Sequence, residues 1–233
     1  MTKKNRKPGF IIGIAVALVL PLSIYALAKA LKKDRVYMPP YYEQTGNGIQ
    51  EVYSTHGTPS FLKMPDFKAV NQVGDSVSLN ESLPYRTLLI GFFFTQCPGP
   101  CPRLMQNMHL IQNAFRPDPK NGRDTISQLI MITVNPEHDS VPVLFQYAQK
   151  HDVNNDRWWL LRGDKTATNQ FARQGLHVVA PGDQYNEQDF VHTQKLVLVD
   201  QERYIRGYYD GLDSADLHRC ADDMGRLYLE KKH

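Results

Sequence analysis

The stretch that decides the fold of this chain reads Leu88-Leu89-Ile90-Gly91-Phe92-Phe93-Phe94-Thr95-Gln96-Cys97-Pro98-Gly99-Pro100-Cys101-Pro102. The apolar run over residues 88–94 is typical of a strand that is buried on both faces. A turn rich in proline and glycine follows and carries both cysteines. Pro102 suits the first position of a helix, where the missing N–H costs nothing. Apolar residues then recur at helical spacing, which predicts a helix with one buried stripe: Leu104, Met108, Ile111 and Phe115.

The two cysteines are therefore expected at the C-terminal end of a central strand, beside the N-terminus of a helix. The helix dipole at that position favours the thiolate over the thiol. Thiolates attack disulfides, and they also bind soft metal ions. A redox pair of this kind is usually spaced Cys-x-x-Cys, whereas three residues separate Cys97 from Cys101. This wider spacing still permits a disulfide, and it also allows both sulfurs to reach one metal ion.

The composition is that of an ordinary globular protein. The chain has 233 residues, enough for one domain of common size with extra segments. The net charge is only +3, and several positive charges lie in the first 35 residues, so we expect no nucleic-acid partner. Three cysteines are too few for a disulfide scaffold. Because Cys220 shares a helical stripe with Leu217, Met224 and Leu227, we expect it to be a small buried hydrophobe.

The N-terminal segment has the pattern of a membrane anchor. Residues 1–8 are basic, and residues 9–28 are about twenty residues without a charge, which is the length of a helix that spans a bilayer. A cleaved signal peptide is the alternative, because Ala26-Leu27-Ala28 has the form of a cleavage site. We favour an uncleaved anchor because the apolar stretch is longer than a usual signal core. Positive charges flank both ends, so the charge pattern leaves the orientation open.

We expect three parts in the chain. Residues 1–33 form an N-terminal cytoplasmic tail and membrane anchor, residues 34–59 form a tether that can include a hairpin, and residues 60–233 form the globular domain. In that domain strands and helices alternate, and a hairpin and a final helix follow. The predicted fold class is therefore α/β: a thioredoxin-like domain with an N-terminal transmembrane helix. The elements expected after the cysteine turn are a strand over 128–134, a helix over 141–151, a strand over 158–161, a helix over 165–174, a hairpin over 195–199 and 204–208, and a helix capped by Ser214 that runs to about residue 230.

Two thiolates can hold Cu(I), and a nitrogen would complete a trigonal site. Among the histidines, His192 stands out because it lies in the loop just before a predicted hairpin strand, and in a thioredoxin-like fold that loop lies beside the redox turn. A loop histidine alone is more often a surface residue, but the cysteine pair and the topology make His192 the predicted third ligand.

The remaining candidates for a metal ligand are weaker. His109 lies off the apolar stripe of its helix and is expected to face solvent. His138 is expected at the mouth of a strand near the site, and Met105 and Met108 are more often core than ligands. The other histidines have no cysteine near them in sequence: His56, His151, His177, His218 and His233.

With these residues in view, the chain resembles the Sco/SenC family of membrane-anchored copper proteins over about residues 65–229. The combination of Cys-x-x-x-Cys-Pro with a histidine about ninety residues later is specific. The resemblance rests on Pro65-Asp66-Phe67, Phe92-Phe93-Phe94-Thr95-Gln96-Cys97-Pro98-Gly99-Pro100-Cys101-Pro102, Thr133-Val134-Asn135-Pro136-Glu137-His138-Asp139, Arg157-Trp158, Leu161-Arg162-Gly163-Asp164 and Asp189-Phe190-Val191-His192-Thr193.

The resemblance implies that Cys97, Cys101 and His192 are copper ligands. It also implies a single-pass anchor in the inner, cytoplasmic membrane, with the C-terminal domain on the periplasmic side. The implied role is to deliver copper to the dinuclear copper site of cytochrome c oxidase, or to reduce the cysteines of that site. The expected partner is the copper-bearing subunit of the oxidase or another copper or thiol protein.

The chain departs from the family at two positions near the cysteines. Family members commonly carry an acidic residue inside the cysteine motif, where this chain has Gly99, and the usual Asp-Pro of the later motif is Asn135-Pro136 here. Neither change removes a ligand, but both reduce the negative charge near the pair. The changes therefore bear on Cu(II) affinity and on the choice of partner rather than on the ligands.

Three readings of the cysteine pair stay open. The first is a copper-binding assembly factor rather than a turnover enzyme. The second is a metal-independent thiol–disulfide oxidoreductase of the cell envelope, in which Cys97 attacks and Cys101 resolves. The third is a stabilising disulfide, although a Pro-Gly-Pro turn at a helix N-terminus is an odd place for one. Reaction with peroxide is conceivable chemistry for such thiolates, but nothing else in the sequence supports it.

Overall fold

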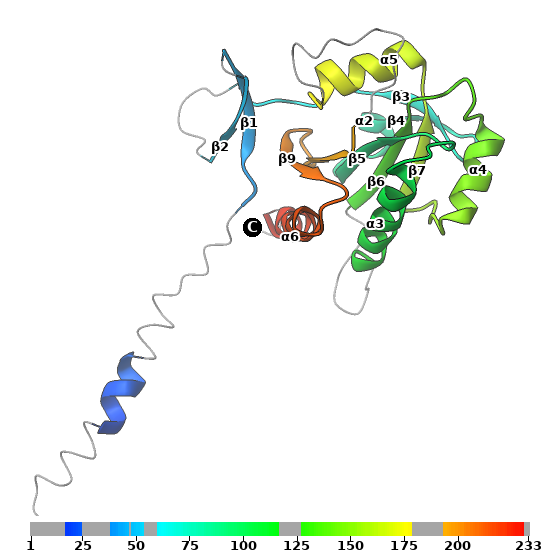
Figure 1. Ribbon diagram of the computed structural model, residues 1–233. Coiled ribbons are helices and arrows are strands. Elements are labelled where there is room, and N and C mark those ends of the chain that lie inside the picture. The colour runs from blue at the N-terminus through cyan, green and yellow to red at the C-terminus, as the bar shows by residue number, and fades with distance from the viewer. Residues whose placement is uncertain are drawn as a thin grey trace, which may run out of the picture. The chain divides into compact units, whose positions relative to one another are not determined.

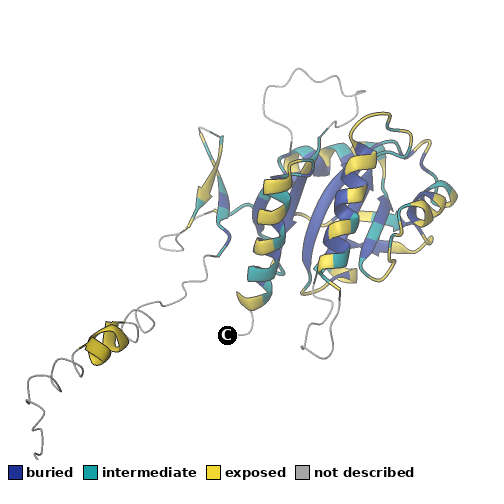
Figure 2. Ribbon diagram, turned by 60° about the horizontal axis from the view of Figure 1, so that its bottom comes forward, coloured by how far each residue is buried: buried dark blue, intermediate teal, exposed yellow. Residues whose placement is uncertain are grey.

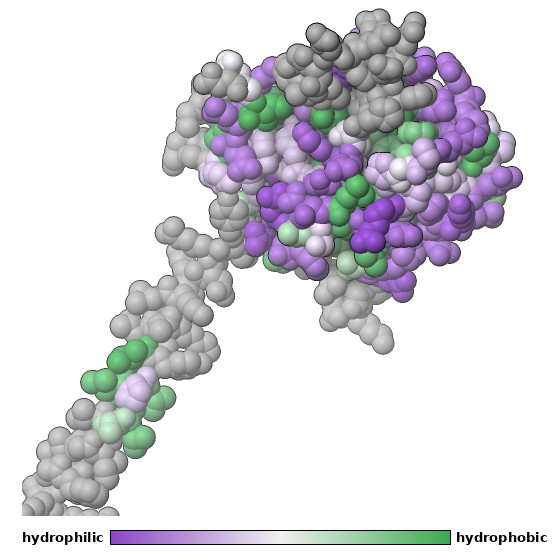
Figure 3. Space-filling view, viewed as in Figure 1, coloured by the Kyte–Doolittle hydropathy of each residue, from purple (hydrophilic) through white to green (hydrophobic). Residues whose placement is uncertain are grey.

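The computed structural model describes residues 17–24, 38–46, 48–53, 60–116, 127–178 and 193–230. The chain divides into two units, Met1–Tyr37 and Met38–His233. In the first unit residues 17–24 are helical, and Figure 3 shows the hydrophobic surface of this helix. Within the described ranges, no helix has the length and apolar character needed to cross a bilayer. Most of the predicted anchor, residues 9–28, lies outside the described residues, so the anchor stays a prediction.

The second unit is built on a mixed seven-stranded sheet in the order β4-β3-β7-β6-β5-β8-β9 (Figure 1). Strands β5, β6 and β7 are parallel neighbours, and the other pairs are antiparallel. Strand β5 lies inside the sheet, between β6 and β8. The strands are β3 (Lys68–Asn71), β4 (Ser76–Ser78), β5 (Thr87–Phe93), β6 (Ser127–Thr133), β7 (Trp158–Arg162), β8 (Lys195–Val199) and β9 (Ile205–Asp210). The predicted α/β class is confirmed.

Helices cover both faces of this sheet. One hydrophobic cluster joins one face to α3, α4 and α6, and a second joins the other face to the segment that follows α5. Figure 2 shows the strands buried and the outer sides of the covering helices exposed. The helical elements are α2 (Leu79–Ser82), α3 (Cys101–Ala114), α4 (Val141–Lys150), α5 (Lys165–Gln170), the π-helical turn η2 (Phe171–Gly175) and α6 (Ser214–Glu230).

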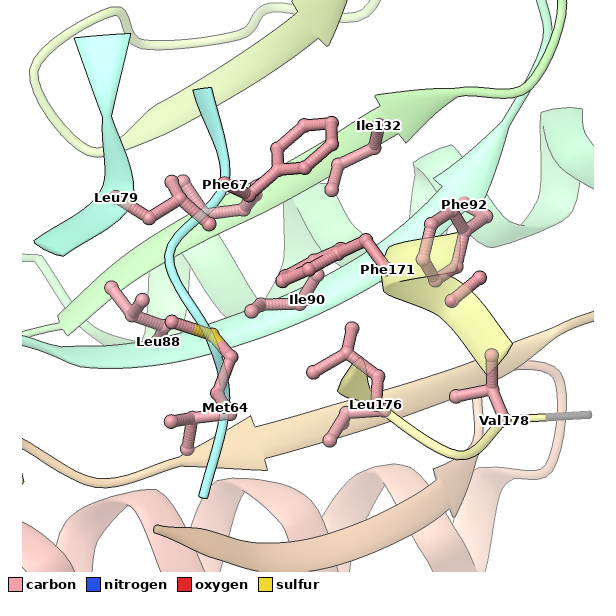
Figure 4. Close-up of a cluster of buried hydrophobic side chains, with 14 of the residues drawn as sticks. Met64, Phe67, Leu79, Leu88, Ile90, Phe92, Ile132, Phe171, Leu176 and Val178 are labelled. Atoms are coloured by element: carbon pink, nitrogen blue, oxygen red, sulfur yellow. The ribbon is translucent and has the colours of Figure 1, made fainter. Parts of the chain in front are cut away.

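The position of β5 inside the sheet explains its continuous apolar sequence. All seven of its residues are buried. Alternate side chains point to opposite faces of the sheet, so Leu88 and Ile90 belong to one cluster and Leu89 and Phe93 to the other. Figure 4 shows Leu88 and Ile90 in the first cluster, where Phe67 and Phe171 stack with ring centroids 4.6 Å apart. The prediction of a strand buried on both faces is confirmed.

Gly91 in the middle of β5 is required by a close approach. A Cβ atom there would lie 2.8 Å from Leu196 Cδ2 and 2.8 Å from Met131 Sδ, closer than real side chains come. These neighbours come from β8 and β6, the two strands that flank β5. The glycine therefore allows tight packing of one face of the sheet directly below the cysteine turn.

Three predicted helix boundaries shift in the structure. Helix α3 begins at Cys101, so Pro102 takes its second position, which also needs no N–H partner. The predicted cap Ser214 is wrong: Asp213 Oδ1 accepts from the Asp216 N–H at 2.9 Å, and Ser214 is inside the helix. The helix predicted over 165–174 ends as an α-helix at Gln170 and continues as the turn η2. Pro65 packs closely against Gly175 in that turn.

Part of the segment predicted as a tether forms an antiparallel hairpin of β1 (Tyr41–Thr45) and β2 (Gly48–Val52). Arg206 on β9 holds the chain just before β1. Its guanidinium donates to the Pro39 carbonyl at 2.8 Å and lies over the Tyr41 ring, 4.0 Å from the centroid. Within the second unit, the chain is therefore tied to the sheet from its first described residues.

Candidate metal centre

Strand β5 and helix α3 bring the two cysteines to one end of the sheet. After β5 ends at Phe93, the Cys97 N–H donates to the Phe94 carbonyl at 3.3 Å and closes a tight turn. Cys101 is the first residue of α3, and the Leu104 N–H makes an early helical hydrogen bond to the Pro100 carbonyl at 2.9 Å. The cysteine turn, residues 94–101, is thus closed at its start and continued as a helix at its end.

The two thiols differ in exposure. Both are free. Cys97 is half-buried, whereas Cys101 is 6% exposed and packs with Leu104 and Met105 in the hydrophobic cluster under α3. Cys97 is therefore the sulfur that a partner molecule meets first, and Cys101 lies behind it.

The two thiols also differ in acidity. Burial opposes ionisation of Cys97, but hydrogen bonds from the Cys101 thiol and from the backbone N–H groups of Cys101 and Gly99 outweigh it and lower the pKa of Cys97. Burial raises the pKa of Cys101 to about 12, and its hydrogen bond to Cys97 adds to that rise. Of the two sulfurs, the more exposed Cys97 therefore ionises first, while Cys101 keeps its proton and donates it in a hydrogen bond to Cys97.

A buried carboxylate lies at the base of the cysteine turn. Asp139 follows β6 and is fully buried. Its oxygens accept hydrogen bonds from the Thr95 N–H at 3.1 Å, from the Thr95 hydroxyl at 2.5 Å and from the Thr133 hydroxyl. His138 Nδ1 lies 2.9 Å from Asp139 Oδ1. We call these four residues, Thr95, Thr133, His138 and Asp139, the Asp139 cluster.

Tyr147 of α4 lies close to the same end of the sheet. Its ring stacks on Phe93 with centroids 5.5 Å apart. Burial raises the pKa of Tyr147, and the negative charges of Cys101, Cys97 and Asp139 raise it further. The phenol therefore stays protonated beside the cysteines throughout the physiological pH range.

The structure brings together two of the three predicted ligands. His192 lies outside the described residues, as does His56. Thr193 is the next described residue, and β8 begins at Lys195. Because β8 runs antiparallel to β5, with Ile90 opposite Val197, its first residue lies at the end of the sheet where β5 ends and the cysteine turn begins.

The weaker candidates have other surroundings. Met105 and Met108 are fully buried core residues, as predicted. Cys220 is also fully buried, which confirms its predicted place in the core, and burial raises its pKa. His109 is half-buried and its Nδ1 is enclosed, so the prediction that it faces solvent is wrong. Among the described residues, no group of three or more His, Cys, Asp or Glu side chains is arranged to hold a metal ion.

The structure confirms the prediction that His138 lies near the site, but sequence reasoning missed the other members of the Asp139 cluster, and it missed Tyr147. A signal for the cluster was present in the motif from Thr133 to Asp139, which follows a buried strand and therefore had to lie at the same edge as the cysteine turn. Tyr147 had no such signal, because an aromatic residue on an amphipathic helix is usually a core residue.

The family follows from comparison with known proteins. The SCO1/SenC family profile matches residues 56–227, well over half of the chain. The chain belongs to the SCO1/SenC family. The SCO1 protein homolog of Bacillus subtilis (strain 168) is 26% identical to it over 167 residues, which cover 71% of this chain and 83% of that protein.

Solved structures of Sco proteins share the fold. BsSco, a member of the Sco family of cytochrome c oxidase assembly proteins in which a disulfide switch was identified, superposes with a TM-score of 0.59 and is 24% identical, covering 73% of this chain and 96% of that one. Bradyrhizobium japonicum ScoI with copper bound superposes with a TM-score of 0.53 and is 22% identical, covering 71% and 99%. The thioredoxin-like Sco fold predicted from the sequence is therefore confirmed.

The donor set of this chain fits the ion that its Sco homologues hold. Copper in its reduced state prefers soft sulfur ligands. The cysteine turn supplies two sulfurs, and the lowered pKa of Cys97 makes one of them a thiolate at modest cost. Ionisation of Cys101 is opposed by burial and by the charge on Cys97, and a bound cation is what removes that opposition.

Proposed function

We propose that this chain binds a copper ion as cargo through Cys97, Cys101 and His192. The ion is then passed to the dinuclear copper site of cytochrome c oxidase, or the same thiols reduce the cysteines of that site. The acceptor is the copper-bearing subunit of the oxidase or another copper or thiol protein. One observation carries the proposal: two free thiols share a hydrogen bond at one end of β5, and the more exposed of them, Cys97, has the lowered pKa.

The start of β8 supports His192 as the third ligand. The strand begins three residues after His192, at the end of the sheet that holds the cysteine turn. A chain of three residues spans at most about 10 Å, and this short separation in sequence supports the proposal that the imidazole reaches the two sulfurs. An imidazole there completes a trigonal site of two sulfurs and one nitrogen, which suits Cu(I).

We further propose that residues 9–28 anchor the chain in the inner membrane and that the domain faces the periplasm. The support is the length of the uncharged stretch and the place of the family's acceptor, a membrane-bound oxidase. Protease treatment of spheroplasts tests this arrangement. The domain is expected to be digested from outside, and protection of the domain contradicts it.

A second function, metal-independent thiol–disulfide exchange, is favoured by the unequal exposure of the two cysteines. The Cys97 thiolate would attack a substrate disulfide and release one substrate thiol. Cys101 would then attack Cys97 Sγ, release the second thiol and leave a Cys97–Cys101 disulfide. The substrate gains two electrons and two protons, and an external thiol reductant must reset the pair.

Copper analysis of the purified full chain tests the first function. The protein is loaded anaerobically with Cu(I), and we expect one copper per chain in the wild type and in the control Cys220→Ser, whose sulfur lies in the core. Cys97→Ser and Cys101→Ser are each expected to lose tight binding. If His192→Ala binds Cu(I) with unchanged affinity and coordination, the three-ligand site is wrong.

Turnover separates the two functions. The full chain is given a protein disulfide substrate and glutathione, with and without a Cu(I) chelator. Full turnover in the presence of chelator favours the oxidoreductase. Turnover at the level of a Cys97→Ser control, together with stoichiometric copper binding, favours the carrier.

A further inference from the structure

Thr95 attaches the start of the cysteine turn to the body of the domain through hydrogen bonds. The turn leaves β5 after Phe93, and Cys97 returns a hydrogen bond to the Phe94 carbonyl, so Thr95 lies inside the closed part of the turn. Beyond it, residues Gln96, Pro98, Gly99 and Pro100 are exposed. The orientation of Thr95 therefore sets the direction in which Cys97 projects.

Thr95 gives both of its polar hydrogens to one carboxylate. Its N–H donates to Asp139 Oδ2 at 3.1 Å and its hydroxyl donates to Asp139 Oδ1 at 2.5 Å. Two hydrogen bonds from one residue fix both the position and the rotation of that residue. Hydrogen bonds to a buried charged group are also stronger than those between neutral groups, so this attachment resists local motion.

Asp139 is itself held from the other side. The Thr133 hydroxyl at the end of β6 donates to Oδ2, and the His138 ring approaches Oδ1. Because β6 is the parallel neighbour of β5, the carboxylate connects the ends of two adjacent strands. A buried carboxylate is expensive unless its oxygens are satisfied, and here two threonines and a histidine satisfy them.

We infer that Asp139 is a positioning residue for the cysteine pair and acts through Thr95. Asp139 places Cys97 at the separation from Cys101 that both copper binding and disulfide formation need. The copper readout of this inference rests on the proposed function, but the placement of the two sulfurs does not. Partners behind metal ligands typically change metal affinity by about 10- to 100-fold when they are removed.

Asp66, an exposed carboxylate elsewhere in the domain, provides a control with the same two kinds of hydrogen-bond donor. It too accepts from one hydroxyl and one backbone N–H, those of Ser78 at 2.8 Å and Asn80 at 3.0 Å. Those partners belong to the start of α2, which precedes β5, whereas Asp139 lies beyond the end of β5. Either substitution can lower stability, but only a substitution in the Asp139 cluster should also affect the cysteines.

The experiment compares full-length wild type, Asp139→Asn, Thr95→Val, Thr95→Ser and Asp66→Asn. The first readout is the reduction potential of the Cys97–Cys101 pair in metal-free protein, measured by equilibration with glutathione buffers. The second is Cu(I) affinity, measured by competition with a chromogenic Cu(I) chelator. Circular dichroism and a thermal melt confirm that each variant is folded.

We expect Asp139→Asn and Thr95→Val to weaken Cu(I) binding about tenfold or more. We also expect them to change the thiol–disulfide equilibrium constant about tenfold, which is about 30 mV for a two-electron couple. Thr95→Ser keeps the hydroxyl and should restore both values. Asp66→Asn should match the wild type in both.

Unchanged potential and unchanged copper affinity in folded Thr95→Val overturn the inference, and so does an equal effect of Asp66→Asn. If Asp139→Asn does not fold, Thr95→Val decides, because Thr95 is only half-buried. If wild type binds no Cu(I), the proposed function fails, while the potentials of the metal-free variants still decide whether Asp139 positions the pair.

Discussion

Buried polar groups of opposite charge lie at the two ends of strand β5 and have different roles. At the C-terminal end, the Asp139 carboxylate accepts hydrogen bonds from the base of the cysteine turn. At the N-terminal end, the Arg203 guanidinium, 7% exposed, donates to backbone carbonyls of Leu79 at 2.9 Å, Leu83 at 2.6 Å and Arg86 at 3.0 Å. The first group holds a reactive segment, and the second closes off a loop.

The two groups differ in the segment of chain that each one holds. Arg203 pairs with the carbonyls that end α2 and adds a hydrogen bond to the Asn80 side chain at 2.8 Å. It lies in the β8–β9 turn with a left-handed φ of 74°, a conformation that costs energy for a residue with a side chain. Asp139 is held by Thr133 and His138 and in turn holds Thr95. The turn beyond Thr95 is exposed and carries Cys97, whose pKa is lowered. One end of β5 is therefore built for stability, and the other for access.

The largest expected contrast is in thiol reactivity at the C-terminal end. Cys97 has a pKa below the 9.0 of an ordinary cysteine, and Cys101 has one of about 12. As pH rises from 6, Cys97 should therefore ionise first and react with iodoacetamide at least about 30-fold faster than Cys101, after allowing for the lower nucleophilicity of a more acidic thiolate. Mass spectrometry of the alkylated chain measures both rates.

Cys101→Ala sharpens this contrast because it removes the thiol that donates to Cys97. Its alkylation midpoint should move up toward 9.0. A wild-type midpoint at or above that value would contradict the hydrogen-bonded pair.

The next effect is on stability at the N-terminal end. Arg203→Met leaves several buried carbonyls without a donor, at about 1–3 kcal/mol each, so we expect the free energy of unfolding to fall by about 3–5 kcal/mol. Denaturant unfolding followed by tryptophan fluorescence measures it, since Trp158 is fully buried. The alkylation midpoint of Cys97 should not change, and a shift comparable to that of Cys101→Ala would remove the distinction between the two ends.

A smaller loss in the free energy of unfolding is expected from Thr133→Val. The two side chains have nearly the same shape, so the change removes the two hydrogen bonds of the hydroxyl: the one it donates to the Asp139 carboxylate and the one it accepts from the Asn135 N–H at 3.1 Å. Hydrogen bonds to charged groups contribute about 1.5–3 kcal/mol, and we expect a loss of about 2 kcal/mol. Thr168→Val is a matched control, because the enclosed hydroxyl of Thr168 has no hydrogen-bond partner among the described residues. Equal losses in the two variants would mean that the bond to Asp139 contributes nothing special.

The smallest effect is expected from Ser78→Ala. Ser78 caps α2 by accepting from the Glu81 N–H at 3.3 Å, and caps of this kind contribute about 1 kcal/mol. Its hydroxyl also donates to Asp66 at 2.8 Å, but Asp66 is exposed, so water can replace that bond. The measurement is again denaturant unfolding, with Ser78→Thr as the variant that keeps the cap. A loss above that of Arg203→Met would show that the cap, and not the guanidinium, holds this end of the strand.

Much of the fold could be predicted because its signals are local. The alternate burial of Leu88 and Leu89 on opposite faces needs a continuous apolar run, and that run is visible in the sequence. The helix after Cys101 has a stripe at helical spacing. Where local signals compete, prediction fails: Asp213 and Ser214 are both good caps, and only the direction of the first helical turn selects Asp213.

The polar contacts at the two ends of β5 could not be predicted in the same way. Thr95 and Asp139 are 44 residues apart, and Arg203 and Leu79 are 124 apart. No periodic pattern links such residues, because their approach depends on which strands pair and in what register.

By itself, the sequence determined the strand–turn–helix unit, the α/β class and the two sulfurs, because burial of alternate side chains and helix periodicity act over neighbouring residues. Only the tertiary structure decided that the Cys101 thiol donates to Cys97 and lowers its pKa, that Asp139 holds the turn and that Arg203 closes the opposite end. The physical reason is that hydrogen bonds to a buried charge act over about 3 Å, and only the pairing of β5 with β6 and β8 brings these groups that close.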